Sequence, residues 1–309
     1  MNNSTNKLIT ILGPTATGKT SFAANLAYCL NAEIISADSR QVYIGMDLGT
    51  GKDLKDYFVN DKKIAHHLVD IVDAGEKYNV FKFQSDFLKA YDDISSRNKI
   101  PILCGGSGMY IEAILKGYKL ISVPVNESLR NELDKFSLEE LAARLSEIKH
   151  THNTSDADTK KRAIRAIEIE TYYTENPDFN FSYPTFKALL FGLKFDRSTI
   201  KERITERLKE RLREGMIDEV QNLLDKGVPA EVLIYYGLEY KFITKYLTKE
   251  YNYNTMVDKL NVAIHQFSKR QMTWFRKMER SGFNIHWIDG YTTMEEKIKI
   301  AMEIIQKES

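Results

Sequence analysis

Cysteine is scarce in this chain of 309 residues, in which Cys29 and Cys104 are the only thiols. Each stands without a C-x-x-C partner, so the sequence predicts neither a zinc site nor a disulfide framework. Such sparse cysteine is typical of a reducing compartment.

Long apolar runs are missing as well. No segment approaches the roughly 18 apolar residues of a membrane span, and residues 1–7 are polar where a signal peptide would have its apolar centre. We therefore expect a cytoplasmic protein without a membrane partner. The formal net charge of +1 neither requires nor excludes a polyanionic partner. The sequence does not determine the oligomeric state, and a monomer is the working expectation.

A phosphate-binding loop stands near the N-terminus. Its sequence GPTATGKT fits the pattern G-x-x-x-x-G-K-[ST] and lies between an apolar run and a helix-like stretch. Backbone N–H groups and the helix N-terminus of such a loop bind phosphate oxygens. Lys19 would reach a terminal phosphate, and Thr20 would hold a magnesium ion. The predicted phosphate-binding residues are Gly13, Pro14, Thr15, Ala16, Thr17, Gly18, Lys19 and Thr20.

The alternation of apolar runs and helical patterns predicts the fold class. Expected strands are 7–12, 33–36, 67–71, 100–103, 188–194 and 284–288, and expected helices are 20–30, 80–97, 109–115, 197–214, 216–226, 235–244 and 253–279. This order is typical of βαβ units. We predict an α/β protein with a P-loop NTPase-like parallel sheet flanked by helices in residues 1–120 and 187–309. Residues 121–186 are predicted to form an all-helical insertion domain.

Asp38 follows the second expected strand, at the edge of the sheet where the phosphate loop should lie. A carboxylate there could orient magnesium or accept a substrate proton, but Asp is also common in turns and helix caps. Position alone leaves both interpretations open. The neighbouring Arg40 and Gln41 carry hydrogen-bonding groups that suit a base edge or a phosphate.

The acidic strand end of a Walker B motif is missing where it might be expected. The strand at 100–103 leads instead into the segment 105–108, Gly-Gly-Ser-Gly. Such glycines allow close backbone approach to a ligand, although a plain strand-to-helix turn is equally compatible with them. The missing acid argues against an ATPase motor and leaves small kinases and group transferases.

Six segments, in order and in register, resemble the tRNA dimethylallyltransferase family, whose members prenylate the adenosine next to the anticodon. The resemblance covers nearly the whole chain, and residues 36–52 distinguish this family from ordinary P-loop kinases. The segments are GPTATGKT (13–20), SADSRQVYIGMDLGTGK (36–52), HHLVDI (66–71), GGSGMYIEAILKG (105–117), DTKKRAIRAIEI (158–169) and HQFSKRQMTWFR (265–276).

The resemblance implies that the loop holds dimethylallyl diphosphate with Mg²⁺. N6 of adenosine 37 in a tRNA then attacks C1 of the prenyl group, and diphosphate leaves. The implied catalytic residues are Asp38 as general base, Ser107 as a nucleotide contact and Lys19 as a stabiliser of the leaving diphosphate. The insertion domain would bind the anticodon stem-loop. The implied tRNA contacts are Asp38, Ser39, Arg40, Gln41, Arg162, Ala163, Ile164, Arg165 and Ala166.

Two further basic stretches have open interpretations. Arg203, Arg207 and Arg211 recur every four residues, and several Lys and Arg residues surround Trp274 and Phe275. Cationic stripes and aromatics suit RNA. The glutamates interleaved with the first stripe favour a solvated helix face, and the two aromatics could equally be core residues.

The sequence departs from the family at two arginines. The first, which helps to bind the diphosphate in the family, falls on Ile234, and the second falls on Glu239. We expect Lys52 or Arg276 to supply the missing cation. We also expect Glu239 to point away from the phosphates and to pair with a basic side chain.

Three other functions remain as alternatives. They are an adenylate isopentenyltransferase acting on free nucleotide, a nucleotide kinase, and a catalytically impaired relative that binds RNA. The cluster Lys160–Arg165 favours a macromolecular RNA, because a mononucleotide needs no such basic surface. The intact phosphate loop and Asp38 argue against the impaired relative.

Overall fold

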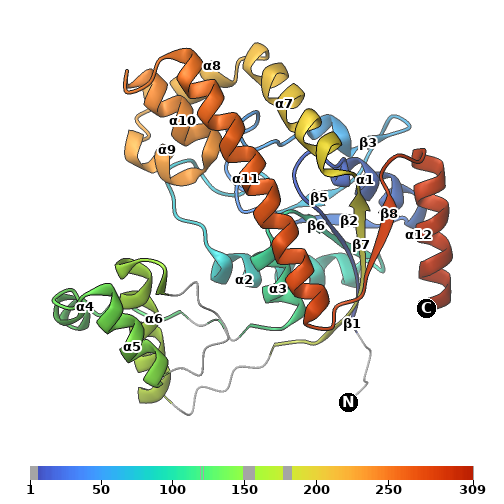
Figure 1. The fold of residues 1–309 in the computed structure, drawn as a ribbon. Coiled ribbons are helices and arrows are strands. Elements are labelled where there is room, and N and C mark those ends of the chain that lie inside the picture. Colours follow the sequence, from blue (N-terminus) through green and yellow to red (C-terminus); the bar gives the residue numbers. More distant parts are fainter. Residues whose placement is uncertain (1–5, 119, 121, 149–156, 177–182, 309) are drawn as a thin grey trace. The chain divides into compact units, whose positions relative to one another are not determined.

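A six-stranded parallel sheet forms the centre of the structure, a computed structural model that describes residues 6–118, 120, 122–148, 157–176 and 183–308. The strands lie in the order β5-β2-β6-β1-β7-β8 (Figure 1). They are β1 (Asn6–Leu12), β2 (Glu33–Ser36), β5 (His66–His67), β6 (Pro101–Gly105), β7 (Phe186–Lys194) and β8 (Ile285–Asp289). The predicted parallel sheet flanked by helices is confirmed.

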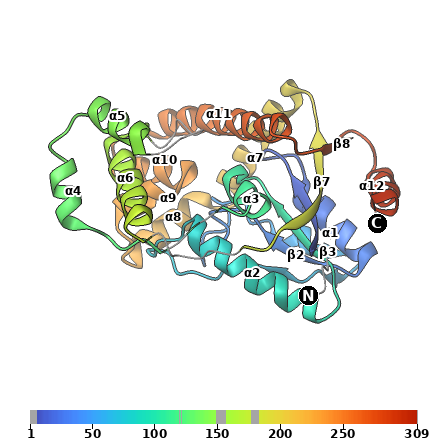
Figure 2. The same ribbon diagram turned by 90° about the horizontal axis from the view of Figure 1, so that it is seen from below.

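The apolar strands are buried because helices cover both faces of the sheet. On one face, α1 (Lys19–Leu30) and α12 (Met294–Glu308) share a core with the strands (Figure 2). On the other face, α2 (Val80–Ser96) and α3 (Gly108–Leu115) pack against β6, and Phe87 of α2 makes an edge contact with Phe186 of β7. The sheet is therefore a rigid base for the loops that leave its carboxyl edge.

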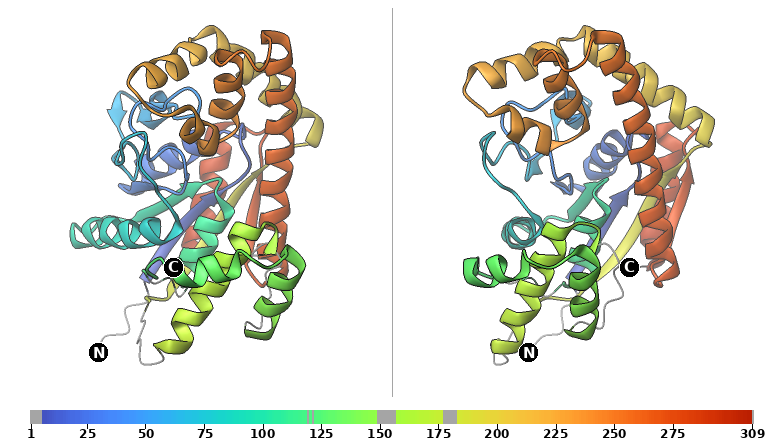
Figure 3. Two further views of the ribbon diagram at one scale, coloured as in Figure 1. Left: turned by 90° about the vertical axis from the view of Figure 1, so that its left-hand side faces the viewer. Right: turned by 60° about the vertical axis from the view of Figure 1, so that its left-hand side comes forward.

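A group of five helices begins beyond that edge, and its last member runs back along the sheet (Figure 3). It consists of α7 (Arg197–Arg213), α8 (Met216–Asp225), α9 (Ala230–Tyr236), α10 (Leu238–Leu247) and α11 (Tyr253–Arg280). In α11 the buried positions recur every three or four residues, from Met256 through Leu260 and Ile264 to Phe275. That spacing places them on one face of the helix, which packs against α3, α7 and α10.

Three local predictions differ from the structure. The strand expected at 67–71 ends at His67, because Leu68 and Asp70 have φ values of 61° and 54°, which do not continue a strand. The single helix expected at 235–244 is two helices, broken at Gly237, whose φ of 152° favours glycine. The sequence patterns also missed a short segment, which comprises η1 (Leu54–Tyr57), β3 (Phe58–Val59) and β4 (Lys62–Lys63).

Residues Lys119–Tyr183 form a separate compact unit. Its helices are α4 (Glu127–Leu133), α5 (Leu138–Ile148) and α6 (Lys160–Glu175), and its core includes Leu141, Leu145 and Ile167. Residues 119, 121, 149–156 and 177–182 of the predicted insertion lie outside the described residues. The remainder, Met1–Tyr118 with Pro184–Ser309, is the other compact unit. Over the described ranges, no helix combines the length and the apolar character needed to cross a membrane.

Candidate active site

The phosphate loop has the expected strand–loop–helix setting, between β1 and α1. Gly18 ends the loop with a φ of 78°, a left-handed conformation that glycine adopts without strain. The Pro14 carbonyl accepts hydrogen bonds from Thr17 Oγ1 at 2.9 Å and from Lys19 Nζ at 3.4 Å. Burial lowers the pKa of Lys19, while the negative charge of Asp38 acts in the opposite direction.

Gln271 of α11 connects this loop to the glycine-rich turn after β6. Its Oε1 accepts from Thr15 N at 2.9 Å, and its Nε2 donates to Gly106 O at 2.9 Å. The side chain is only 7% exposed. Sequence reasoning missed this residue. The available signal was a large polar side chain on the mainly apolar buried face of α11.

Asp38 and Ser107 follow β2 and β6, two strands that end side by side. Asp38 Oδ1 accepts from Arg40 N at 2.9 Å, and Ser107 Oγ accepts from Ser39 N at 3.1 Å. Asp38 therefore stabilises a turn, as the structural interpretation required. Its carboxylate also lines a cavity, so this contact does not exclude a chemical role.

The cavity has a volume of about 610 Å³ and lies over the carboxyl ends of the strands. It is lined by most of the site residues that were predicted within 1–118, together with side chains from α7, α10 and α11. The predicted residues that line it are Thr15, Ala16, Gly18, Lys19, Thr20, Asp38, Ser39, Arg40, Gln41 and Ser107. This convergence makes the cavity the candidate active site.

The basic stripe of α7 faces this cavity instead of presenting a fully solvated surface. Arg207 Nη2 donates to Asp53 Oδ2 at 2.6 Å, and Arg211 Nη2 donates to both Asp53 carboxylate oxygens at 3.1 Å. Arg203 stacks on the Phe195 ring, with its Cζ 4.6 Å from the ring centroid. All three arginines line the cavity.

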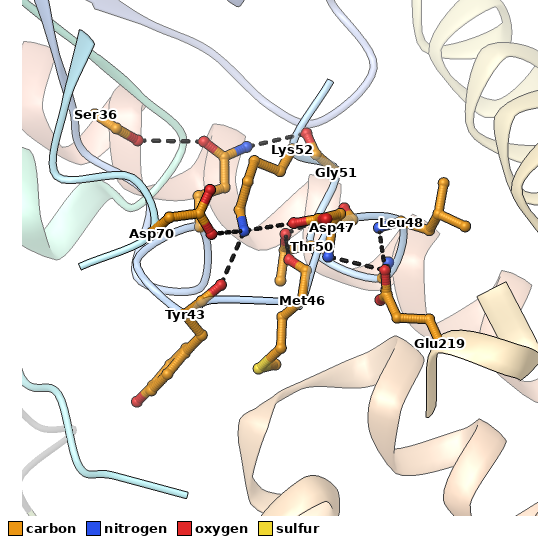
Figure 4. Close-up of polar contacts among 12 residues, drawn as sticks. Ser36, Tyr43, Met46, Asp47, Leu48, Thr50, Gly51, Lys52, Asp70 and Glu219 are labelled. Carbon is orange, nitrogen blue, oxygen red and sulfur yellow. Dashed lines mark hydrogen bonds and ion pairs between the residues drawn. The ribbon is translucent and has the colours of Figure 1, made fainter. Parts of the chain in front are cut away.

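The loop between residues 46 and 52 is fixed by two charged side chains (Figure 4). Glu219 of α8 accepts from the backbone N–H groups of Asp47, Leu48 and Gly49 at 2.7–3.0 Å. Lys52 is fully buried and donates to Asp70, to Asp47 Oδ1 at 2.6 Å and to the Tyr43 carbonyl at 2.8 Å. The prediction that Lys52 supplies a free cation for the diphosphate is therefore wrong.

The expectation that Glu239 points away from the site is also wrong. Glu239 lies in the first turn of α10, directly after the break at Gly237, and lines the cavity. Burial raises the pKa of Glu239 to about 7, against the effects of its own backbone N–H and of Arg211 and Arg207. Arg276, the other expected cation, is exposed on α11.

In the helical unit, the predicted contacts differ in accessibility. Ala163, Ile164 and Ala166 are at most 8% exposed and belong to the core of that unit. Arg162 is 63% exposed and pairs with Asp158 at 3.3 Å. Arg165 donates to Glu168 and, at 2.9 Å, to the Val123 carbonyl. Within the segment 162–166, therefore, only the two arginines present side chains that an RNA could contact.

Glu168 anchors α6 within the unit. Burial would raise the pKa of Glu168, but hydrogen bonds from Arg130, the Asn126 N–H and Arg165 outweigh it and lower the value to about 2. The carboxylate is thus ionised at neutral pH and holds Arg165 in place.

The chain is similar to known tRNA dimethylallyltransferases over nearly its whole length. The tRNA dimethylallyltransferase 1 of Parabacteroides distasonis is 57% identical over 98% of this chain and 98% of its own length. The tRNA dimethylallyltransferase 2 of a Bacteroides fragilis strain is 56% identical over 97% of this chain and 98% of its own length.

Solved structures give the same result for the fold. The tRNA isopentenylpyrophosphate transferase of Bacillus halodurans superposes with a TM-score of 0.71 at 30% identity, over 98% of this chain and 96% of that one. A eukaryotic dimethylallyltransferase acting on tRNA has a TM-score of 0.78 at 22% identity, over 98% and 80%, and supports the fold alone. The family model described as IPP transferase matches residues 41–278. The chain belongs to the IPP transferase family.

Proposed function

We propose that this enzyme transfers a dimethylallyl group from dimethylallyl diphosphate to N6 of adenosine 37 in tRNA. The observation that carries the proposal is the convergence of the phosphate loop, Asp38 and Ser107 on one cavity in a member of this family. A di- or triphosphate held by the loop alone would suit a kinase equally well. The carboxylate and the hydroxyl beside it suit an amine acceptor.

The chain's residues divide the work of the alkyl transfer. The bond between C1 and the diphosphate oxygen breaks as the bond between N6 and C1 forms. N6 is a weak nucleophile because it is conjugated to the purine, so Asp38 accepts its proton during attack. The two electrons of the broken bond leave with the diphosphate, whose growing charge Lys19 and the loop N–H groups stabilise. Ser107 contacts the nucleotide.

Magnesium fits the oxygen donors at this edge of the cavity. Thr20, the second residue of α1, lines the cavity there. Mg²⁺ is usually bound by one or two protein oxygens together with substrate phosphates and water. Among the described residues there is no group of three or more His, Cys, Asp or Glu placed to hold a metal. Thr20 would hold the ion together with the substrate, and the bound ion would neutralise charge on the diphosphate.

The tRNA would contact two separate parts of the chain. Residues 38–41 border the cavity and would meet the flipped adenine and its neighbours. In the helical unit, Arg162 and Arg165 would bind phosphates of the anticodon stem-loop. Ala163, Ile164 and Ala166 would contribute by seating α6 in its core. A tRNA substrate also supports the expected cytoplasmic location.

One assay separates this function from its alternatives. The protein is incubated with labelled dimethylallyl diphosphate, Mg²⁺ and either unmodified tRNA or adenosine monophosphate. We expect label in the tRNA alone, and none in a matched tRNA with guanosine at position 37. Label in the mononucleotide alone would overturn the tRNA assignment, and label in neither acceptor would favour a kinase or an impaired relative.

A further inference from the structure

Two arginines on one side of α7 face the phosphate loop across the cavity. Arg207 Nη1 lies 3.5 Å from Thr15 Oγ1, so its guanidinium touches the loop itself. Arg211 is one turn further along the helix and only 8% exposed. Buried arginines are costly unless their charge is balanced. Their position beside a phosphate loop therefore calls for an anionic partner.

Asp53 supplies part of that balance and fixes the geometry. It accepts from Nη2 of both Arg207 and Arg211, at 2.6–3.1 Å. Each guanidinium has five N–H donors, so each retains donors after this pairing. Glu239 faces the same pair, but its buried carboxyl is partly protonated at neutral pH because its pKa is about 7. The guanidinium donors that Asp53 does not use therefore remain available at the cavity.

Neither of the two cations expected from the sequence lines the cavity. Lys52 is fully buried between Asp47 and Asp70, and Arg276 is exposed on α11. The two positions at which family members carry arginine hold Ile234 and Glu239 in this chain. The arginines of α7 line the same cavity as Glu239.

We propose that Arg207 and Arg211, held by Asp53, form the second cationic wall of the diphosphate site, opposite Lys19. They would supply positive charge that neither Ile234 nor Glu239 can supply. Guanidinium groups suit this role because they donate pairs of parallel hydrogen bonds to phosphate oxygens. The inference rests on the proposed function only in taking the bound anion to be a diphosphate.

Calorimetric titration with inorganic pyrophosphate and Mg²⁺ tests the wall without requiring catalysis. We expect Arg211→Met to weaken binding by about tenfold or more, because a charge-assisted hydrogen bond is lost. Arg213→Gln removes the same charge from an exposed position on α7 and should bind as the wild type does.

A second variant guards against misfolding of the first, since Arg211 is buried. Arg207 is 28% exposed and Asp53 keeps its pairing with Arg211, so Arg207→Gln should fold and should also weaken pyrophosphate binding by about tenfold. Wild-type pyrophosphate affinity in a folded Arg207 or Arg211 variant would overturn the wall, and so would a loss confined to tRNA binding. If Arg211-dependent pyrophosphate binding is found in a protein that modifies no tRNA, the wall stands and the proposed function fails.

Discussion

Gln271 holds the backbone N–H of Thr15 at 2.9 Å, although the two residues are 256 positions apart in the chain. The same carboxamide donates to Gly106 O, so α11 fixes the phosphate loop relative to the turn that carries Ser107. An added Cβ at Gly106 would lie 2.5 Å from Gln271 Nε2, so a side chain there would displace the Gln271 carboxamide. The two halves of the site are thus positioned by a residue that the proposed mechanism does not use.

Replacing Gln271 by leucine should therefore damage diphosphate binding as well as stability. The change leaves the Thr15 N–H and the Gly106 carbonyl without partners, at a cost of about 1–3 kcal/mol each if neither finds water. We expect a higher KM for dimethylallyl diphosphate with a smaller change in kcat. Gln266→Leu, at an exposed position of the same helix, is the control for added hydrophobicity. Equal KM values for the two variants would remove Gln271 from the positioning role.

The sequence predicts those parts of the site that are encoded by consecutive residues. The phosphate loop is one such unit, and Asp38 and Ser107 follow from the rule that functional groups gather where parallel strands end. Gln271, Asp53 and Arg211 could not be predicted in this way. Their roles depend on how α7 and α11 pack over the sheet, and a helix pattern does not specify which side of its polar surface faces a cavity.

The same limit explains the errors about charge. Lys52 looked like a free cation because nothing in the sequence shows that Asp47 and Asp70 enclose it. Glu239 was expected to avoid the phosphates, yet the break at Gly237 directs the start of α10 into the cavity. In both cases tertiary contacts decide the electrostatic role of a residue whose local sequence is uninformative.

Replacing Asp38 by asparagine should remove the proposed base and keep the turn. Asparagine retains an Oδ1 that can accept from Arg40 N, the contact that Asp38 makes at 2.9 Å. We expect kcat to fall by about 10²–10⁴-fold, the usual contribution of a general base, with tRNA affinity largely retained. Single-turnover measurements with saturating tRNA test this. Asp61→Asn, in the exposed β3–β4 turn, is the matched control, and near-normal turnover of Asp38→Asn would eliminate the general-base assignment.

Replacing Arg162 by alanine should weaken tRNA binding in a salt-dependent manner. Its side chain is 63% exposed and pairs with Asp158, an exposed residue just before α6, in an interaction of small net value. Loss of one phosphate contact should reduce the slope of log K against log salt by about 1. Lys299→Ala removes an exposed charge from α12 as a control. A slope equal to that of the wild type would identify Arg162 as a solvated surface group.

Replacing Glu239 by glutamine should change how stability depends on pH. Burial raises the pKa of Glu239 from 4.5 to about 7, while Arg211 and Arg207 oppose and Asp38 reinforces the shift. The folded state therefore holds the proton more tightly than the unfolded state. The stability that this group contributes is complete below pH 4.5 and is lost as the pH rises through 7.

Glutamine remains neutral throughout, so the variant should gain about 1–3 kcal/mol relative to the wild type between pH 5 and pH 8. Urea unfolding at the two pH values measures this gain, with Glu231→Gln on the exposed surface of α9 as control. A difference between variant and wild type that is the same at both pH values would show that the Glu239 carboxyl titrates alike in the folded and unfolded chains.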